Sequence, residues 1–173
     1  MRPAPATVSV EWIDHHDPAV ARAMHGVLVP AYAQEAALLQ VEHFPPMERS
    51  AAEIQAQAGL SLGAFIAHQL VGAMSLEPDD EPGQILVSSL VVHPASQRLG
   101  AGLALLSEAI ARAPEAVFAV ATAALNEPAL RLYRSLGFVE YRRGSIGPEE
   151  IALVKLRRSP GPVHRHQVSQ LSP

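Results

Sequence analysis

The feature that most constrains this chain is a glycine-containing turn between an apolar strand and a helix. The apolar run ending at Leu90 to Val92 stops at His93-Pro94, and Gly100 and Gly102 then lead into a stretch rich in Leu and Ala. The first N–H groups of such a helix have no acceptor within it, and the helix dipole adds partial positive charge there. The glycines let a ligand approach the backbone without a Cβ in the way. The turn therefore predicts a site for an anion such as phosphate.

Composition narrows the classes of protein that can carry such a turn. A chain of 173 residues, 49% hydrophobic and 17% charged, is long enough for one globular domain with a full core. A net charge of −4 provides no basic surface for nucleic acid or an anionic membrane. The absence of cysteine excludes disulfides, thiolate metal sites and thiol chemistry. We find no signal-peptide core and no apolar run of membrane-spanning length, so we expect a cytoplasmic protein without nucleic-acid or membrane partners.

The first part of the chain predicts a strand and a long helix. Residues 7–13 alternate with the period of a half-buried strand, and Asp17-Pro18 predicts the start of a helix that runs to Leu39. Pro30 removes a backbone donor inside this helix and predicts a kink or two separate helices. The segment Glu42 to Pro46 is expected to be a non-helical loop, and a helix resumes over residues 50–58.

The middle of the chain predicts antiparallel strands joined by turns. Two apolar runs, residues 60–68 and 71–76, predict a hairpin whose turn is Gln69-Leu70. Residues 77–83 form an acidic turn, and the next strand covers residues 84–92. Ser88-Ser89 interrupts the apolar pattern of that strand, which a bulge would explain, and bulges often lie beside active sites.

The second half predicts helices that alternate with strands. Four residues recur at helical spacing after the glycine turn and predict the face that packs on the sheet: Leu99, Leu103, Leu106 and Ile110. A strand is expected over 116–121, a helix between Asn126 and Gly137, and a strand pair over 138–141 and 151–156. This order predicts an α+β or α/β fold in three layers, with one sheet and helices on both faces. We expect a single domain of residues 1–157 and a disordered tail of residues 158–173.

Two motifs resemble the GNAT superfamily of N-acetyltransferases. The segment Gln97-Arg98-Leu99-Gly100-Ala101-Gly102 resembles the acyl-CoA motif of that superfamily, Q/R-x-x-G-x-G/A, and follows the expected strand. A second segment, with Asn126, Ala129, Leu132, Tyr133 and Gly137-Phe138 at the family spacing, resembles a later helix and strand. Short glycine patterns recur by chance, but two motifs in the expected order make the resemblance specific over nearly the whole chain.

The resemblance implies a mixed, mostly antiparallel sheet that splays into a V between the strand ending at Val92 and the strand near residues 116–121. Acetyl-CoA, the co-substrate, would lie in this cleft. Its pantetheine arm would contact Leu90, Val91, Val92 and Asn126. Its pyrophosphate would rest on the turn formed by Gln97, Arg98, Leu99, Gly100, Ala101, Gly102 and Leu103. An exposed sheet edge commonly forms dimers in such folds, so a homodimer stays open.

The resemblance also implies that Tyr133 is the general acid that protonates the departing thiolate. Backbone N–H groups near Leu90 to Val92 would polarise the thioester carbonyl. Without the resemblance, purely structural roles for these residues stay open. Tyr133 can pack in the core from an amphipathic helix, Asn126 can simply cap that helix, and Arg98 can be a solvated side chain.

The general base and the acceptor are less constrained by the sequence. The candidate bases lie on segments that can border the acceptor side: Glu35, Glu42, His43, Glu77 and Asp79. Acidic residues favour a cationic acceptor, and an aromatic ring suits an apolar group. We therefore expect the acceptor to be a small primary amine or polyamine that attacks acetyl-CoA directly in a ternary complex. The residues expected to contact it are Glu42, His43, Phe44 and Glu77.

Two alternatives remain open: a protein N-terminal or lysine acetyltransferase, and a non-catalytic acyl-CoA sensor on the same fold. No metal site is expected, because His15-His16 and His43 lack ligand spacing and partner carboxylates.

Overall fold

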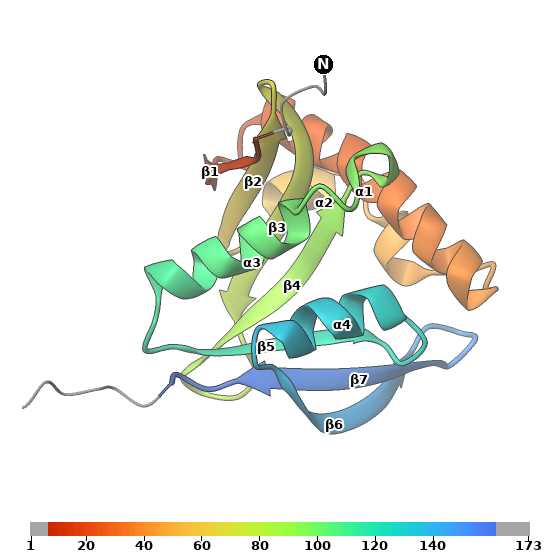
Figure 1. Cartoon of the computed structure of the whole chain (residues 1–173). Helices are drawn as coiled ribbons and strands as arrows, with labels where there is room; N and C mark the ends of the chain where they lie inside the picture. Colours follow the sequence, from red (N-terminus) through yellow and green to blue (C-terminus); the bar gives the residue numbers. More distant parts are fainter. Residues whose placement is uncertain (1–6, 162–173) are drawn as a thin grey trace, which may run out of the picture.

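The computed structural model describes residues 7–161, which form helices on both sides of a central sheet (Figure 1). In chain order the elements are β1 (Ser9–Ile13), α1 (Pro18–Leu39), the 3₁₀ helix η1 (Pro45–Glu48), α2 (Ala51–Ala56), β2 (Leu60–Ile66), β3 (Gln69–Pro78), β4 (Gln84–Val92), the 3₁₀ helix η2 (Pro94–Ser96), α3 (Ala101–Arg112), β5 (Val117–Ala123), α4 (Glu127–Ser135), β6 (Val139–Ile146) and β7 (Ile151–Arg158). Within the described range, none of the helices combines the length and the apolar character needed to cross a bilayer.

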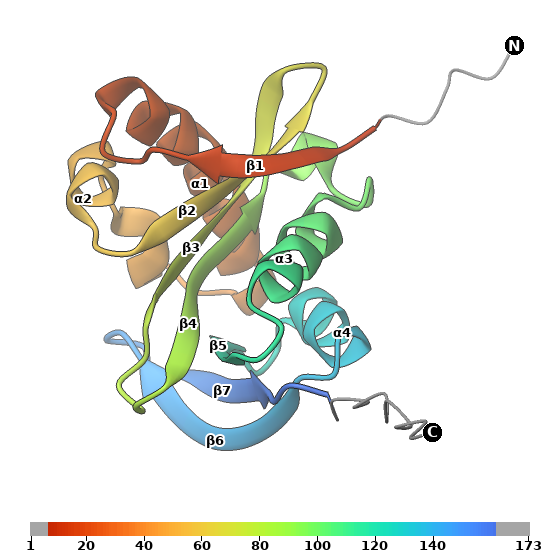
Figure 2. The ribbon, with the colours of Figure 1, turned by 90° about the vertical axis from the view of Figure 1, so that its left-hand side faces the viewer.

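The strands form one mixed sheet in the order β1-β2-β3-β4-β5-β7-β6. Neighbouring strands are antiparallel except β4 and β5, which run parallel and are connected through α3. Figure 2 shows β1 to β4 as one wing of the sheet and β5, β7 and β6 as the other. The expected mixed, mostly antiparallel sheet is therefore confirmed.

Helices cover both faces of the sheet, as predicted. Adjacent residues of a strand point to opposite faces, and Ala73 and Met74 of β3 accordingly belong to different cores. Ala73 and Val91 pack against α1 and α2, whereas Met74 shares a larger core with Leu105 of α3 and Leu130 of α4. The views in Figures 1 and 2 agree that α1 and α3 lie on opposite sides of β2 and β3.

The sheet opens in its middle. β4 and β5 pair only over Gln84 to Val87, after which β4 pairs with β3 alone. The opening coincides with a bulge in β4. Leu76 of β3 pairs with Val87 and Ser75 pairs with Ser89, so Ser88 has no partner on β3. A bulge bends its strand and increases the local twist. The predicted irregularity and the predicted V-shaped opening are both confirmed.

Three local predictions differ from the structure. α1 runs unbroken through Pro30, so the two-helix alternative is wrong; only one backbone donor is lost, and packing on the sheet holds the helix. Pro45 and Pro46 begin η1, because the first positions of a helical turn need no N–H donor. The β2–β3 turn lies at Ala67-His68, both with positive φ, and Gln69-Leu70 belongs to β3. Ala-His is an unusual pair for such a turn, which composition therefore did not reveal.

The buried face of α3 also differs from the prediction. Ala101, Leu105 and Leu106 are buried, whereas Leu99 and Leu103 are 48% and 47% exposed. Leu99 precedes the first residue of α3 and is therefore outside the helical phase that the spacing assumed. Leu106 is buried as predicted and Ile110 packs against the same core, so the prediction is wrong only for Leu99 and Leu103.

The end of the folded region lies beyond the predicted boundary at residue 157. β7 continues to Arg158 because this strand pairs with β5 as far as Phe118. β6 likewise extends past the predicted end, to Ile146, against β7. From residue 162 onward, the expected tail lies outside the described residues.

Candidate active site

The predicted anion site is a tight turn that leads into α3. Arg98 and Gly100 have φ values of +65° and +87°, a backbone conformation that glycine adopts without strain. The N–H of Ala104 donates to the carbonyl of Gly100. The N–H groups of the three preceding helical residues therefore have no acceptor within α3. Together with the positive end of the helix dipole, they suit the turn to an anion.

β4 presents a free edge beside this turn. The N–H of His93 donates to the carbonyl of Val71 at 2.8 Å, which identifies the hydrogen-bonded register between β3 and β4. Hydrogen-bonded and non-hydrogen-bonded pairs alternate, so the backbone groups of Leu90 and Val92 point away from β3. The side chain of Gln97 donates to the carbonyl of Val92 at 3.3 Å on that side. An extended ligand can therefore pair with this edge as an added strand would.

A cavity of about 550 Å³ joins the turn to the free edge of β4. Its lining includes the predicted catalytic residue Tyr133 and all but one of the predicted co-substrate residues: Leu90, Val91, Val92, Gln97, Arg98, Gly100, Ala101, Gly102, Leu103 and Asn126. Leu99 is the exception, because its side chain is exposed and does not line the cavity. We refer to this space as the cleft.

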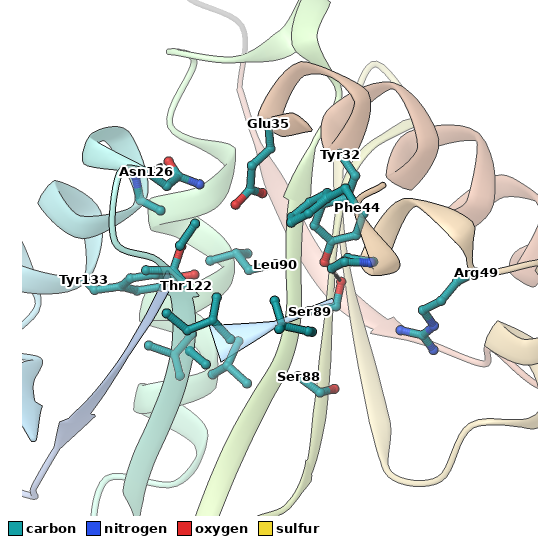
Figure 3. A pocket seen from close by; sticks show the side chains of 18 residues that line it. Tyr32, Glu35, Phe44, Arg49, Ser88, Ser89, Leu90, Thr122, Asn126 and Tyr133 are labelled. Atoms are coloured by element: carbon teal, nitrogen blue, oxygen red, sulfur yellow. Dashed lines mark hydrogen bonds between the residues drawn. The ribbon is translucent and has the colours of Figure 1, made fainter. Parts of the chain in front are cut away.

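A second cavity, of about 330 Å³, lies between α1, the bulge of β4, the end of β5 and α4 (Figure 3). Phe44, Pro46, Ile146 and Leu153 provide apolar walls. We refer to this space as the acceptor cavity. It shares six lining residues with the cleft: Tyr32, Glu35, Leu90, Asn126, Ala129 and Tyr133. The two spaces therefore meet at these residues.

Tyr133 is placed at the junction by the local structure of α4. The side chain of Asn126 accepts a hydrogen bond from the N–H of Ala129 at 3.2 Å and so caps the helix. Tyr133 lies two turns along α4, is 5% exposed, and packs its ring against Phe138 at 5.8 Å between centroids. Burial raises its pKa, and the neighbouring Tyr32 and Glu35 add to the shift. Its hydroxyl therefore stays protonated at neutral pH.

Glu35 of α1 extends into the junction. Figure 3 shows its carboxyl group between Asn126 and Tyr32. Burial raises the pKa of Glu35, and the side chain of Asn126 acts in the opposite direction. On the same helix, Tyr32 exchanges a hydrogen bond of 3.1 Å with the hydroxyl of Ser89, and burial raises its pKa despite this bond. A half-buried carboxyl whose pKa is raised holds a proton more readily than a free Glu side chain and is suited to accept one from an amine.

Most predicted acceptor residues lie away from the acceptor cavity. Phe44 is 3% exposed and lines it, as expected. Glu42 and His43 are exposed and line neither cavity; their backbone N–H groups donate to Glu149 at 3.0 and 2.8 Å. Glu77 also lines neither cavity. The structure therefore places Glu42, His43 and Glu77 outside both cavities.

Two of the four acidic residues in the turn that suggested a cationic acceptor form ion pairs within the protein. Asp79 is 1% exposed in its side chain and pairs with Lys155 at 2.8 Å. Burial opposes the charge of Lys155, but hydrogen bonds and attraction to Asp79 raise its pKa. Glu81 pairs with Arg142 at 2.8 Å. The turn therefore stabilises the contact between β3 and the second wing of the sheet.

Tyr32 and Arg49 are among the residues of the acceptor cavity that sequence reasoning missed. Tyr32 precedes Glu35 by three positions on α1, so helical spacing alone places both on one face. Arg49 lies between η1 and α2, where no periodic pattern indicates a direction. Within residues 7–161, no group of three or more His, Asp or Glu residues is arranged to hold a metal ion.

The comparison with known families identifies the chain. Residues 29–138 match the model of the "Acetyltransferase (GNAT) family". The chain belongs to the GNAT acetyltransferase family. Enzymes of this family use acetyl-CoA as co-substrate. The matched range contains the free edge of β4, the glycine turn and α4 with Tyr133, the elements that surround the cleft.

Individual relatives extend this result. UPF0157 protein YqkA of Bacillus subtilis is 32% identical over 130 residues, which are 75% of this chain and 37% of that protein. The chain thus spans little more than a third of this relative's length. The ribosomal-protein-S18-alanine N-acetyltransferase of Escherichia coli is 18% identical with a TM-score of 0.69, over 91% of this chain and 98% of that one. YncA of Salmonella typhimurium, a structure with acetyl-CoA, is 18% identical with a TM-score of 0.66, over 95% and 99% of the chains. At this level of sequence identity, the two structures show only that the fold is shared.

Proposed function

We propose that this protein transfers an acetyl group from acetyl-CoA to the primary amine of a small molecule, by direct attack in a ternary complex. The observation that carries the proposal is the junction of two cavities at Glu35, Leu90 and Tyr133. One cavity ends at an anion-binding turn and the other is walled by apolar side chains. Two substrates can therefore enter separate spaces and meet at one point.

The cleft has the groups that acetyl-CoA requires. The amides at the start of α3, with Gly102 in the first turn, offer donors to the diphosphate, and Arg98 adds positive charge. The backbone of Leu90 and Val92 offers paired donors and acceptors to the amides of the pantetheine arm. Gln97 and Asn126 lie along the same wall. The residues present thus fit the co-substrate.

The chemistry needs a proton acceptor for the amine and a proton donor for the thiolate. Glu35 takes a proton from the ammonium group, which leaves a neutral amine that attacks the thioester carbonyl. The N–H of Leu90 polarises that carbonyl, a role typically worth about 3 kcal/mol for one donor. As the C–N bond forms and the C–S bond breaks, the hydroxyl of Tyr133 donates its proton to the departing sulfur. The second amine proton replaces the one that Tyr133 has donated, and Glu35 releases its proton to solvent through the open cleft.

The volume of the acceptor cavity supports a small-molecule acceptor in preference to a protein terminus. A volume of about 330 Å³ is at the lower end of the range for small-molecule sites. The acidic turn gives little support to a polyamine, because Asp79 and Glu81 are paired with Lys155 and Arg142. Glu77 and Asp80, the other two acids of the turn, line neither cavity. A cytoplasmic location and a homodimer stay predictions.

The test is thiol release from acetyl-CoA with a panel of primary amines, polyamines and short peptides. We expect release with small amines, and we expect Tyr133→Phe to reduce it at saturating substrates. Turnover on peptides alone would favour the protein acetyltransferase. Calorimetric binding of acetyl-CoA without release on any acceptor would overturn the proposal in favour of a sensor.

A further inference from the structure

Arg49 is a half-buried cation in the wall of the acceptor cavity. It lies just after η1, and Figure 3 shows its guanidinium group directed toward the cavity from the side opposite Asn126. Its hydrogen-bond partner is the side-chain oxygen of Gln57. In the described part of the chain, no carboxylate lies within 4 Å of its nitrogen atoms. The charge of Arg49 is therefore left without an ionic partner.

A buried polar network holds Arg49 from behind. The amide of Gln57 donates to the hydroxyls of Ser75 at 2.9 Å and Ser61 at 3.2 Å, and both serines are buried. Ser61 in turn contacts Nδ1 of the buried His15 at 3.0 Å, and Nε2 of His15 contacts the carbonyl of Gln57 at 3.0 Å. Because Gln57 is fixed on several sides, its oxygen keeps the guanidinium in one place. Such preorganisation is what an anion-binding arginine needs.

Two acids could compete for Arg49, and neither pairs with it. Glu53 is engaged in the capping box of α2, where its carboxylate accepts from the N–H and hydroxyl of Ser50 at 2.7 and 2.8 Å. Glu35 is the only acidic residue that lines the acceptor cavity in the described structure, and Arg49 is its only cation. The cavity thus carries one group of each sign, with apolar walls around them.

We propose that the acceptor is an amino acid, a small molecule whose amine faces Glu35 and whose carboxylate is bound by Arg49. This inference rests on the proposed acetyl transfer and specifies its substrate class. Arginine binds carboxylates through two parallel hydrogen bonds, which gives direction as well as affinity. A polyamine would instead bring a second positive charge to Arg49. Apolar walls that include Phe44 and Leu153 suit an aliphatic or aromatic body between the two charged groups.

The test compares acceptors that differ only in the carboxylate. The α-series is L-leucine, L-leucinamide and 3-methylbutylamine, and the ω-series is 6-aminohexanoate and hexylamine. Hydrogen bonds to a charged group contribute about 1.5–3 kcal/mol, so kcat/KM should favour the carboxylate-bearing member of at least one series by about 10- to 100-fold. The series that shows the preference reports the spacing between the amine and the carboxylate.

Variants connect this preference to Arg49. Arg49→Gln is expected to remove it by raising KM for the amino acid, while kcat/KM for the neutral amine and KM for acetyl-CoA stay within about twofold of wild type. Arg49→Lys should restore part of the preference, because charge remains without the bidentate geometry. Arg112→Gln is the matched control, since Arg112 pairs with Glu108 on α3 and lines neither cavity.

The outcomes separate the two proposals. Release with neutral amines at rates equal to those with amino acids, unchanged by Arg49→Gln, overturns the amino-acid inference and leaves the acetyl transfer intact. Loss of activity on every acceptor in Arg49→Gln, neutral amines included, also overturns it, because Arg49 would then act on the site as a whole. No release with any amine by the wild-type protein overturns both proposals.

Discussion

Replacing Gly102 by alanine separates folding from co-substrate binding. Gly102 is the second residue of α3, and an added Cβ would lie 3.4 Å from Cδ2 of Leu132 and 3.7 Å from Cγ2 of Val92. Both distances are ordinary van der Waals contacts, so the protein accommodates the methyl group without movement. Alanine is favoured over glycine in helices by up to about 1 kcal/mol. We therefore expect the Tm of Gly102→Ala to be unchanged or slightly higher.

The same methyl group should weaken the binding of acetyl-CoA. Leu132 and Val92 line the cleft, so the new Cβ lies on the surface that the diphosphate approaches in the proposed complex. Loss of one or two hydrogen bonds to a charged group, about 1.5–3 kcal/mol, corresponds to a 10- to 100-fold increase in Kd. KM for acetyl-CoA should rise by a similar factor, while kcat and KM for the acceptor stay near wild type.

The assay is thiol release at varied acetyl-CoA, with calorimetry for Kd and thermal unfolding for stability. Gly26→Ala in α1 is the matched control, because an added Cβ there meets no atom within 4 Å and Gly26 lines neither cavity. An unchanged Kd in a variant with an unchanged Tm would refute the placement of the diphosphate over Gly102.

Three further predictions test other parts of the site and the fold. Tyr133→Phe should lower kcat by about 100-fold or more with KM for acetyl-CoA near wild type, whereas an unchanged kcat would leave Tyr133 a packing residue. The raised pKa of Glu35 should appear as a rise of kcat/KM with pH, through a pKa above the usual range for Glu. Glu35→Gln should abolish that rise without lowering Tm at pH 7, since ionisation of the half-buried carboxyl opposes folding above its pKa. A residual rise with the same pKa in Glu35→Gln would exclude Glu35 as the base. Asp79→Asn leaves Lys155 unpaired in a largely buried position and should cost about 3 kcal/mol, or roughly 6–12 °C in Tm, with kcat retained; an undiminished Tm would contradict a stabilising role for this pair.

Features that depend on neighbours in the chain were accessible from the sequence. The cap by Asn126, the turn at Gly100 and the bulge at Ser88 each follow from the side chain or backbone freedom of a few consecutive residues. The resemblance of two motifs then implied the GNAT fold, which the matched family and the splayed sheet bear out. These signals are local because caps, turns and bulges satisfy backbone groups within one or two turns of chain.

The acceptor side depends on contacts between distant segments. Glu35 was one of five candidate bases in the sequence. Only the packing of α1 and η1 against the bulge determines that Glu35 and Arg49, and not Glu42 or Glu77, line the acceptor cavity. The acidic turn gave a charge whose effect could not be assigned without Lys155, which is 76 residues away from Asp79 in the chain.

By itself, the sequence determined the strand, glycine turn and helix of the cleft. The groups offered to a ligand there are backbone N–H and C=O groups, whose positions follow from the local secondary structure. Only the tertiary structure decided which side chains line the acceptor cavity. Side-chain charge acts over a few ångströms in space regardless of separation along the chain. The choice of acceptor is therefore specified by the assembled fold, and Arg49, positioned through Gln57 by residues of β2 and β3, is where we propose that it is made.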